Sequence, residues 1–171
     1  MPFLSVPSLD RHLRMSFLAA QREHVAETGH TDAGGLSLAD LACDSIWTGY
    51  IRGLLEGTLG HPGMRPLTCS EWWWLDHGMD GPEFIARVTL FRSVTGTRLT
   101  WSIRPSQRPN HHTAPLLAAV IPLLSAQHIP ELTLECPAHD TPTRTAIEQT
   151  GAHPLPSPTP KARYSLPLRV R

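Results

Sequence analysis

Arginine and histidine side chains crowd one short segment, Arg-Pro-Ser-Gln-Arg-Pro-Asn-His-His-Thr-Ala at positions 104–114. Before it, Arg98 to Ile103 alternates polar and apolar residues as an antiparallel strand does. After it, Leu116 to Leu124 has apolar residues at helical spacing. A loop between the carboxyl end of a strand and the start of a helix is a place where ligands, and anions above all, bind. The sequence therefore predicts a ligand site in this loop.

A metal site is the alternative for the histidines of this loop, His111 and His112. Cys136, His139 and Asp140 follow the next apolar segment and could join them. Their spacing matches no closed zinc site, and Asp140 is explained by the start of a helix that it can cap. We expect no metal.

The composition of the chain limits the classes of protein to which it can belong and the partners it can bind. The chain has 171 residues, 40% hydrophobic and 18% charged, which indicates one globular domain and excludes disorder of the whole chain. Fifteen Lys and Arg balance fifteen Asp and Glu, which argues against a nucleic-acid surface or a polybasic membrane patch. The three cysteines form no CxxC pair, so we expect a cytoplasmic protein without disulfides.

The elements that position the loop follow from apolar periodicity and turn residues. A first helix begins at Ser8 or Asp10 and ends near Gly29, and a second covers Ile46 to Leu55. Strand patterns and one more short helix pattern come after these two helices. The predicted strands are Thr68–Asp76, Glu83–Phe91, Arg98–Ile103, Glu131–Cys136 and Arg163–Leu166, and the short helix is Thr141–Thr150.

The segment from Ile103 to Ala114 resembles the acetyl-CoA loop of the GNAT acetyltransferase superfamily. In that family an Arg or Gln, two residues, a Gly, one residue and a Gly or Ala form a turn whose backbone N–H groups hold the CoA pyrophosphate. The first position falls here on Arg108, and the two small positions fall on His111 and Thr113. Pro109 has no N–H to donate, and His111 opposes the positive φ that a glycine allows.

A second segment also resembles the family. Cys136 to Arg144, followed by Gly151, is similar to the family's strand, Asn-x-x-Ser-Arg helix start and ending glycine. Asp140 stands in place of the Asn and Thr143 in place of the Ser. With weaker similarity upstream, at Ser16–Ala20 and Trp73–Asp76, the resemblance covers most of the chain.

The resemblance implies an α+β (mixed α/β) fold: a single GNAT-like domain over residues 1–171. Its central mixed, mostly antiparallel twisted sheet is flanked by helices and splayed between Arg98–Ile103 and Glu131–Cys136. Acetyl-CoA is the implied acyl donor, with its pantetheine in that splay. The expected cofactor-binding residues are Trp101, Ser102, Ile103, Arg108, Pro109, Asn110, His111, His112, Thr113, Ala114, Asp140 and Thr143.

Acid and base groups are needed because the family's reaction is a direct transfer of an acetyl group to an amine. A base removes the amine proton and an acid protonates the leaving thiolate. Glu135 is the first choice for the base because it lies next to the expected splay, with Glu83 and His112 as alternatives. The helix at Thr141–Thr150 has no tyrosine, which leaves Tyr164 as a substitute for the acid.

The function expected from these residues is N-acetylation of a small-molecule or peptide amine. The alternative is a catalytically silent GNAT-like binding module that has lost strong CoA binding, which Pro109 and His111 favour. We expect no nucleic acid and no membrane as partners, and association into a homodimer stays open.

Overall fold

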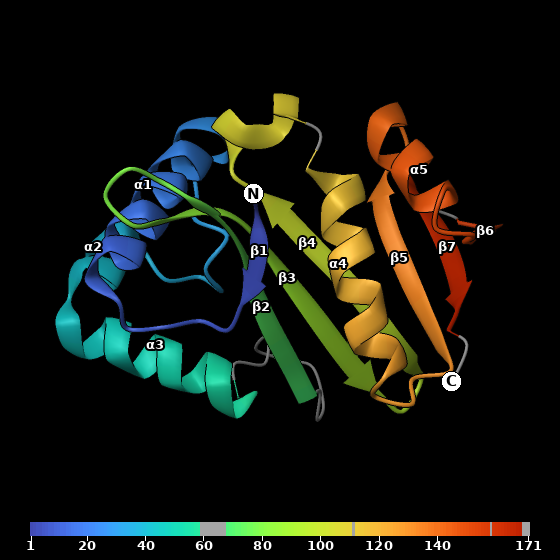
Figure 1. The fold of residues 1–171 in the computed structure, drawn as a ribbon, viewed down its shortest axis with the longest axis horizontal. Helices are drawn as coiled ribbons and strands as arrows, with labels where there is room; N and C mark the ends of the chain where they lie inside the picture. The colour runs from blue at the N-terminus through green and yellow to red at the C-terminus, as the bar shows by residue number, and fades with distance from the viewer. Residues whose placement is uncertain (59–67, 111, 158, 169–171) are drawn as a thin grey trace. The chain divides into compact units, whose positions relative to one another are not determined.

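A computed structural model describes residues 1–58, 68–110, 112–157 and 159–168 of the chain (Figure 1). Asp10 caps the first helix as predicted, because its Oδ1 accepts a hydrogen bond of 2.8 Å from the Leu13 N–H, and Gly29 ends that helix in the left-handed conformation. The elements are β1 (Phe3–Ser5), α1 (Arg11–Thr28), α2 (Leu38–Ala42), α3 (Asp44–Glu56), β2 (Thr68–His77), β3 (Pro82–Ser93), β4 (Gly96–Ile103), a 3-10 helix (Pro105–Asn110), α4 (Thr113–Ser125), β5 (Glu131–Pro137), α5 (Thr141–Glu148), β6 (His153–Leu155) and β7 (Lys161–Pro167).

The strands form one seven-stranded sheet in the order β1-β2-β3-β4-β5-β7-β6. β4 and β5 pair in parallel, whereas β1 with β2, β5 with β7, and β6 with β7 pair antiparallel. The predicted α+β fold with a mixed, mostly antiparallel sheet is confirmed. The prediction did not include β1, β6 or α2, which are only three to five residues long.

The chain divides into two compact units. The amino-terminal unit consists of Met1–Thr89 and Trp101–Pro109, and the carboxy-terminal unit consists of Leu90–Thr100 and Asn110–Arg171. Strands β3 and β4 each contribute residues to both units. The expectation of a single domain stays a prediction.

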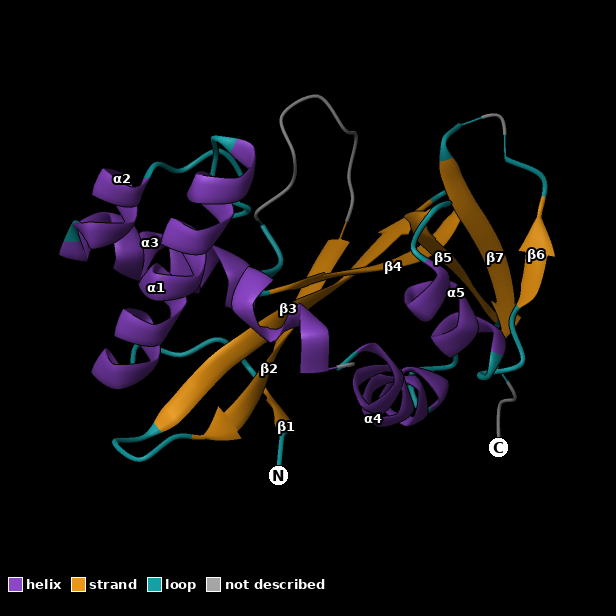
Figure 2. Ribbon diagram, turned by 90° about the horizontal axis from the view of Figure 1, so that it is seen from above, coloured by secondary structure: helices purple, strands orange, loops and turns teal. Residues whose placement is uncertain are grey.

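α1 and α3 lie on the same side of β2 and β3 (Figure 2), and the core of the amino-terminal unit contains aromatic rings among its aliphatic side chains. Phe17 of α1 stacks on Trp73 of β2, with ring centroids 5.1 Å apart and an angle of 14° between the planes. Phe84 of β3 meets both rings edge-on. Because such aromatic pairs add to the burial of their area, they hold α1 firmly against the strands of this unit.

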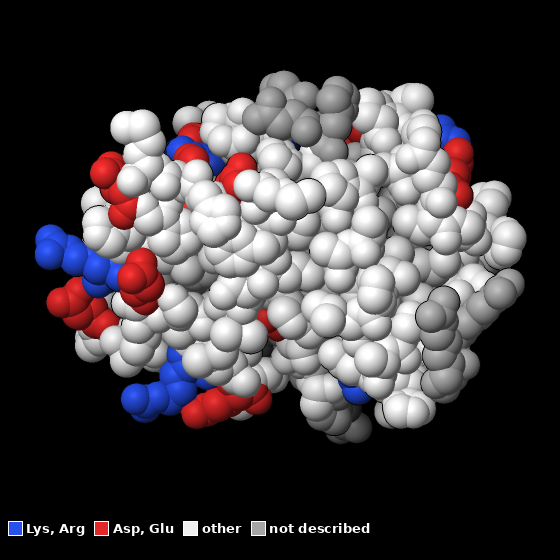
Figure 3. Space-filling model, viewed as in Figure 1, with Lys and Arg blue, Asp and Glu red and all other residues white. Residues whose placement is uncertain are grey.

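Aliphatic side chains fill the core of the carboxy-terminal unit. Leu116, Leu117 and Val120 of α4 are completely buried, as are Leu132 and Leu134 of β5. α4 carries no charged residue, and Figure 3 is almost entirely white where this helix lies. α4 is only 13 residues long, and no helix among the described residues is both long and apolar enough to cross a membrane.

Candidate functional site

The predicted loop folds as a short helix rather than as an open turn. β4 ends with Trp101, Ser102 and Ile103, and the 3-10 helix Pro105–Asn110 follows directly. Arg108, Pro109 and Asn110 are its last three residues, and α4 begins at Thr113. His111, one of the expected CoA-binding residues, lies outside the described residues.

Two carboxylates of α1 and β3 hold the start of this 3-10 helix. Glu23 accepts a hydrogen bond of 2.7 Å from Arg104 Nε and one of 3.0 Å from the Ser106 N–H. Arg104 also donates to Glu83 at 2.9 Å. Burial alone raises the pKa of Glu23, but the hydrogen bonds from Ser106 and Arg104 outweigh it, so that its pKa lies below the ordinary value. Glu83, one of the alternative bases, is therefore engaged in an ion pair.

Arg108, the residue expected to attract the pyrophosphate, has an internal partner. Its Nη1 lies 2.5 Å from Glu27 Oε1 of α1, and its Nε donates to the Ile103 carbonyl at 3.3 Å. The hydrogen bond from Arg108 lowers the pKa of Glu27. Both side chains are nearly half exposed, so the pair is accessible to an anion from solvent. A phosphate that binds Arg108 therefore has to share its guanidinium with the Glu27 carboxylate or displace that carboxylate.

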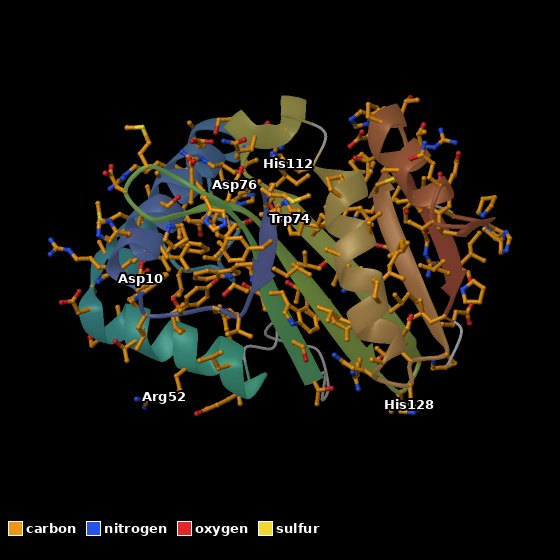
Figure 4. All side chains as sticks on the ribbon, in the orientation of Figure 1. Asp10, Arg52, Trp74, Asp76, His112 and His128 are labelled. Carbon is orange, nitrogen blue, oxygen red and sulfur yellow. The ribbon has the colours of Figure 1, made fainter. Side chains whose placement is uncertain are left out.

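The starts of α4 and α5 differ in how their first N–H groups are satisfied. The Asp140 carboxylate caps α5 by accepting from the Thr143 N–H at 3.1 Å, so that this N–H is not available to an anion. His112 occupies the corresponding position of α4 (Figure 4) but makes no side-chain capping hydrogen bond. At the start of α5 the Thr143 N–H is thus excluded as an anion donor.

Glu135 and Tyr164, the expected base and acid, leave opposite faces of the sheet. In the register of β5 and β7, Glu135 lies opposite Arg163, whereas Tyr164 lies opposite Leu134. Because successive side chains of a strand alternate between faces, the two groups are not brought together. Glu135 instead pairs with Arg163, Oε1 to Nε at 3.1 Å.

The hydroxyl of Tyr164 is tied into α5. It donates to Glu148 Oε1 at 2.9 Å and accepts from Arg144 Nε at 3.1 Å. Burial, the largest cause, raises the pKa of Tyr164, the hydrogen bond from Arg144 lowers it and the one to Glu148 raises it, with a net rise. The phenol is therefore protonated at neutral pH, as an acid has to be, although its O–H is engaged in a hydrogen bond to Glu148.

His24 of α1 is a buried polar residue that the sequence reasoning missed. It is 5% exposed, and its Nε2 lies 3.5 Å from the hydroxyl of Ser102, one of the expected CoA-binding residues. One signal could have found it: His24 falls on the apolar face of the helix, one turn after Ala20 and two turns after Phe17. Among the described residues, no group of three or more His, Cys, Asp and Glu is arranged to hold a metal ion.

Solved structures share this fold at low sequence identity. RimJ of Mycobacterium smegmatis, in complex with CoA-disulfide, has a TM-score of 0.61 and 12% identity, over 98% of this chain and 86% of that one. The GNAT domain of S. lividans PAT has a TM-score of 0.59 and 13% identity, over 96% and 89%. The ribosomal-protein-S18-alanine N-acetyltransferase of Escherichia coli has a TM-score of 0.55 and 13% identity, over 98% and 94%.

Sequence comparison gives no corresponding match. No protein-family model matches the chain, and no curated protein does. At 12–13% identity the structural likeness concerns the path of the backbone rather than the side chains. It extends over nearly the whole chain in all three cases, and it confirms the predicted architecture: the protein has the fold of the GNAT acetyltransferases.

Proposed function

We propose that this protein is an acetyltransferase that moves an acetyl group from acetyl-CoA directly to a primary amine of a small molecule or peptide. The observation that carries the proposal is the shared fold, which covers nearly the whole chain and which three named acetyltransferase structures have in common. One of those structures holds a CoA derivative, and another is named for the acetylation of an alanine on a ribosomal protein.

In this proposal the backbone of Trp101–Ile103 binds the pantetheine of acetyl-CoA. The pyrophosphate is bound by Arg108, His111 and the backbone N–H groups of Thr113 and Ala114 at the start of α4. At the start of α5 the Asp140 carboxylate occupies the Thr143 N–H, which supports the choice of α4. Glu135 and Tyr164 remain proposed as base and acid, on separate proton paths because they leave opposite faces of the sheet.

Calorimetry with acetyl-CoA on the full chain tests this proposal. Arg108→Ala should raise the Kd about tenfold at moderate salt, because a charge-assisted hydrogen bond to phosphate contributes roughly 1.5 kcal/mol. Arg52→Ala, an exposed arginine of α3 (Figure 4), is the matched control and should leave the Kd unchanged. A natural protein that shows no binding, or equal Kd values for Arg108→Ala and the control, contradicts the proposal.

A silent binding module is the second candidate, and two observations favour it. Pro109 removes one backbone donor, and Glu27 already occupies Arg108. The double variant Pro109→Arg and His111→Gly restores an N–H, a charge and conformational freedom at these positions. Acetyl-CoA binding by the double variant alone supports the silent module. Binding by the natural protein, together with release of CoA when an amine is added, supports the enzyme.

A further inference from the structure

A cavity of about 800 Å³ lies in the amino-terminal unit, between the end of α1 and the start of α2. Four aliphatic side chains line it: Val25 of α1, Leu36 of the loop that follows, and Leu38 and Ala39 of α2. Cavities of roughly 300–1,000 Å³ with a mostly apolar lining are typical of sites for small molecules. The cavity therefore has the size and the lining of a ligand site.

Two glycines leave space in the wall of this cavity. Gly34 and Gly35 have φ values of 66° and 90°, which a residue with a side chain rarely adopts. Apart from its chain neighbours, a Cβ atom added to either glycine would meet no atom within 4 Å. A ligand can therefore come directly against the backbone at these two positions.

The polar groups of the loop are paired with one another. Thr31 Oγ1 donates to the Leu36 carbonyl, and the Leu36 N–H donates to the Ala33 carbonyl at 3.3 Å. Ser37 and Asp40 form a capping box at the start of α2. Because these groups already have partners, the loop offers a ligand mainly apolar contact.

Asp32 gives the cavity its charge. It is the one carboxylate among the described lining residues, and none of these is Lys or Arg. Its Oδ1 accepts from Gln21 Nε2 at 2.5 Å, which holds the carboxylate in place. Arg87 lies 3.9 Å from that oxygen but also pairs with Glu71, so that Asp32, Glu71 and Arg87 together carry one net negative charge. This part of the wall therefore favours a cation over an anion.

One side chain connects the wall of the cavity to strand β4. Asp32 Oδ2 lies 3.5 Å from His24 Nε2, and the same nitrogen lies 3.5 Å from Ser102 Oγ of β4. In the proposed function Ser102 belongs to the stretch that binds pantetheine. The cavity is therefore near the strand beside which the acetyl group would be transferred.

We propose that this cavity binds the apolar body of the amine acceptor, and that the protein acetylates amines with one charge and a compact hydrocarbon body in preference to polyamines. This inference rests on the proposed function and names its substrate class. Aliphatic side chains of the wall hold the hydrocarbon body, and the negative charge at Asp32 attracts the ammonium group. A polyamine would place a second charge against the apolar wall, where it has no partner.

The transfer balances in atoms and charge. The ammonium first gives one proton to water. The amine nitrogen then bonds to the acetyl carbon, and the C–S bond breaks with its electron pair on sulfur. The second proton of the nitrogen ends on the CoA thiolate, so that the products are an amide and the free thiol.

A nitrogen–proton NMR titration of the full chain with cyclohexylmethylamine tests binding without turnover. The amide signals of Gly34 and Gly35 should shift as the amine is added. Ala39→Phe adds a ring at the cavity and should raise the Kd about tenfold, because the ligand loses apolar contact. Ala42→Phe, at an exposed alanine of the same helix outside the lining, is the matched control and should leave the Kd unchanged.

Cyclohexylmethanol, which has the same body without the charge, tests the role of Asp32. Asp32→Asn should raise the Kd of the amine about three- to fivefold and leave that of the alcohol unchanged. Added salt should likewise raise the Kd of the amine alone in the natural protein. Equal changes for the amine and the alcohol in both measurements overturn the choice of a cation.

Release of the CoA thiol measures turnover. The natural protein should have at least about a tenfold higher kcat/KM for cyclohexylmethylamine than for spermidine, and Ala39→Phe should remove most of this difference without changing the Kd for acetyl-CoA. Equal kcat/KM values for the two amines, or equal effects of Ala39→Phe and Ala42→Phe, overturn this inference while the turnover upholds the proposed function. Shifts at Gly34 and Gly35 without thiol release support the ligand class and contradict the proposed function. No shift and no release contradict both.

Discussion

Glu71 of the amino-terminal unit is completely buried and pairs with Arg87, whereas Glu135 of the carboxy-terminal unit pairs with Arg163 on a partly exposed face. The interior of the first unit contains the buried ion pair of Glu71 and Arg87, and Glu71 also accepts a hydrogen bond from Trp73 Nε1. The interior of the second consists mainly of aliphatic side chains and the ring of Tyr164, and its ion pairs lie nearer to solvent.

The difference shows that stabilising a core and fixing the positions of individual side chains depend on different interactions. Apolar side chains stabilise a core without fixing the direction of any single group, whereas a buried ion pair is tolerated only in one geometry. In the amino-terminal unit the charged groups hold the two segments that carry candidate chemistry. Arg87 fixes the loop at Asp32, and Arg104 fixes the start of the 3-10 helix.

Glu71→Ala should have the largest effect on stability, a loss of about 3–5 kcal/mol in the free energy of unfolding. It leaves Arg87 without its buried partner and Trp73 Nε1 without its acceptor, which now lies at 2.8 Å. Glu135→Ala, in the ion pair of the other unit, should cost less than about 1 kcal/mol. Urea unfolding measures both. Equal losses would show that the two units do not differ in this way.

Tyr164→Phe should cost about 1 kcal/mol, because the hydroxyl loses hydrogen bonds to Arg144 and Glu148 while the ring stays in the core. Ser165→Ala, on the neighbouring residue and the opposite face, should cost less than about 0.5 kcal/mol. Thermal unfolding measures both. If Tyr164 is also the acid, Tyr164→Phe lowers kcat more than tenfold and leaves the Kd for acetyl-CoA unchanged. Equal kcat values for the variant and the natural protein would show that Tyr164 is not the acid.

Acid should weaken the attachment of the 3-10 helix to α1. The pKa of Glu23 and that of Glu27 are lowered in the folded protein, so their contribution is fully present above the unfolded pKa of about 4.5 and is lost as the pH falls through the folded values. Glu23→Gln should therefore reduce the fall in stability between about pH 5 and pH 3. Glu56→Gln, at an exposed end of α3, is the control. An unchanged slope in Glu23→Gln would contradict this assignment.

Glu27→Gln should have the smallest effect, a two- to threefold lower Kd for acetyl-CoA. The variant frees Arg108 from a half-exposed ion pair, and such pairs contribute roughly 0.5 kcal/mol. The gain should shrink as salt is added, because screening weakens both interactions of Arg108. A higher Kd in Glu27→Gln would mean that Glu27 positions Arg108 instead of competing for it.

Helices and strands that have a local sequence signal could be predicted from the sequence alone. The alternation of Arg98–Ile103 and the helical spacing of Leu116–Leu124 located β4 and α4, and Asp10 and Asp140 each cap the helix that follows them. The three residues of β1 are too few for a periodic signal.

Contacts between distant residues could not be predicted in the same way. Ser102 meets His24 across 78 positions, and Arg108 meets Glu27 across 81. Periodicity shows which face of a helix is apolar but not which strand that face meets. Likewise, the opposite faces of Glu135 and Tyr164 follow from the register of β5 and β7, which two short strand patterns do not define. The binding of CoA by the predicted loop stays a prediction.

Neither unit is one continuous piece of chain, because Leu90–Thr100 belongs to the carboxy-terminal unit and Trp101–Pro109 to the amino-terminal one. During synthesis the amino-terminal unit lacks its last segment until residue 109 has left the ribosome. That segment brings Ser102 to His24, Arg104 to Glu23 and Arg108 to Glu27. A nascent chain that stops at Thr89 therefore exposes two acidic side chains and a histidine of α1 without these partners. No single cut in the chain yields both units intact, which rules out exchanging either one between proteins by a simple fusion.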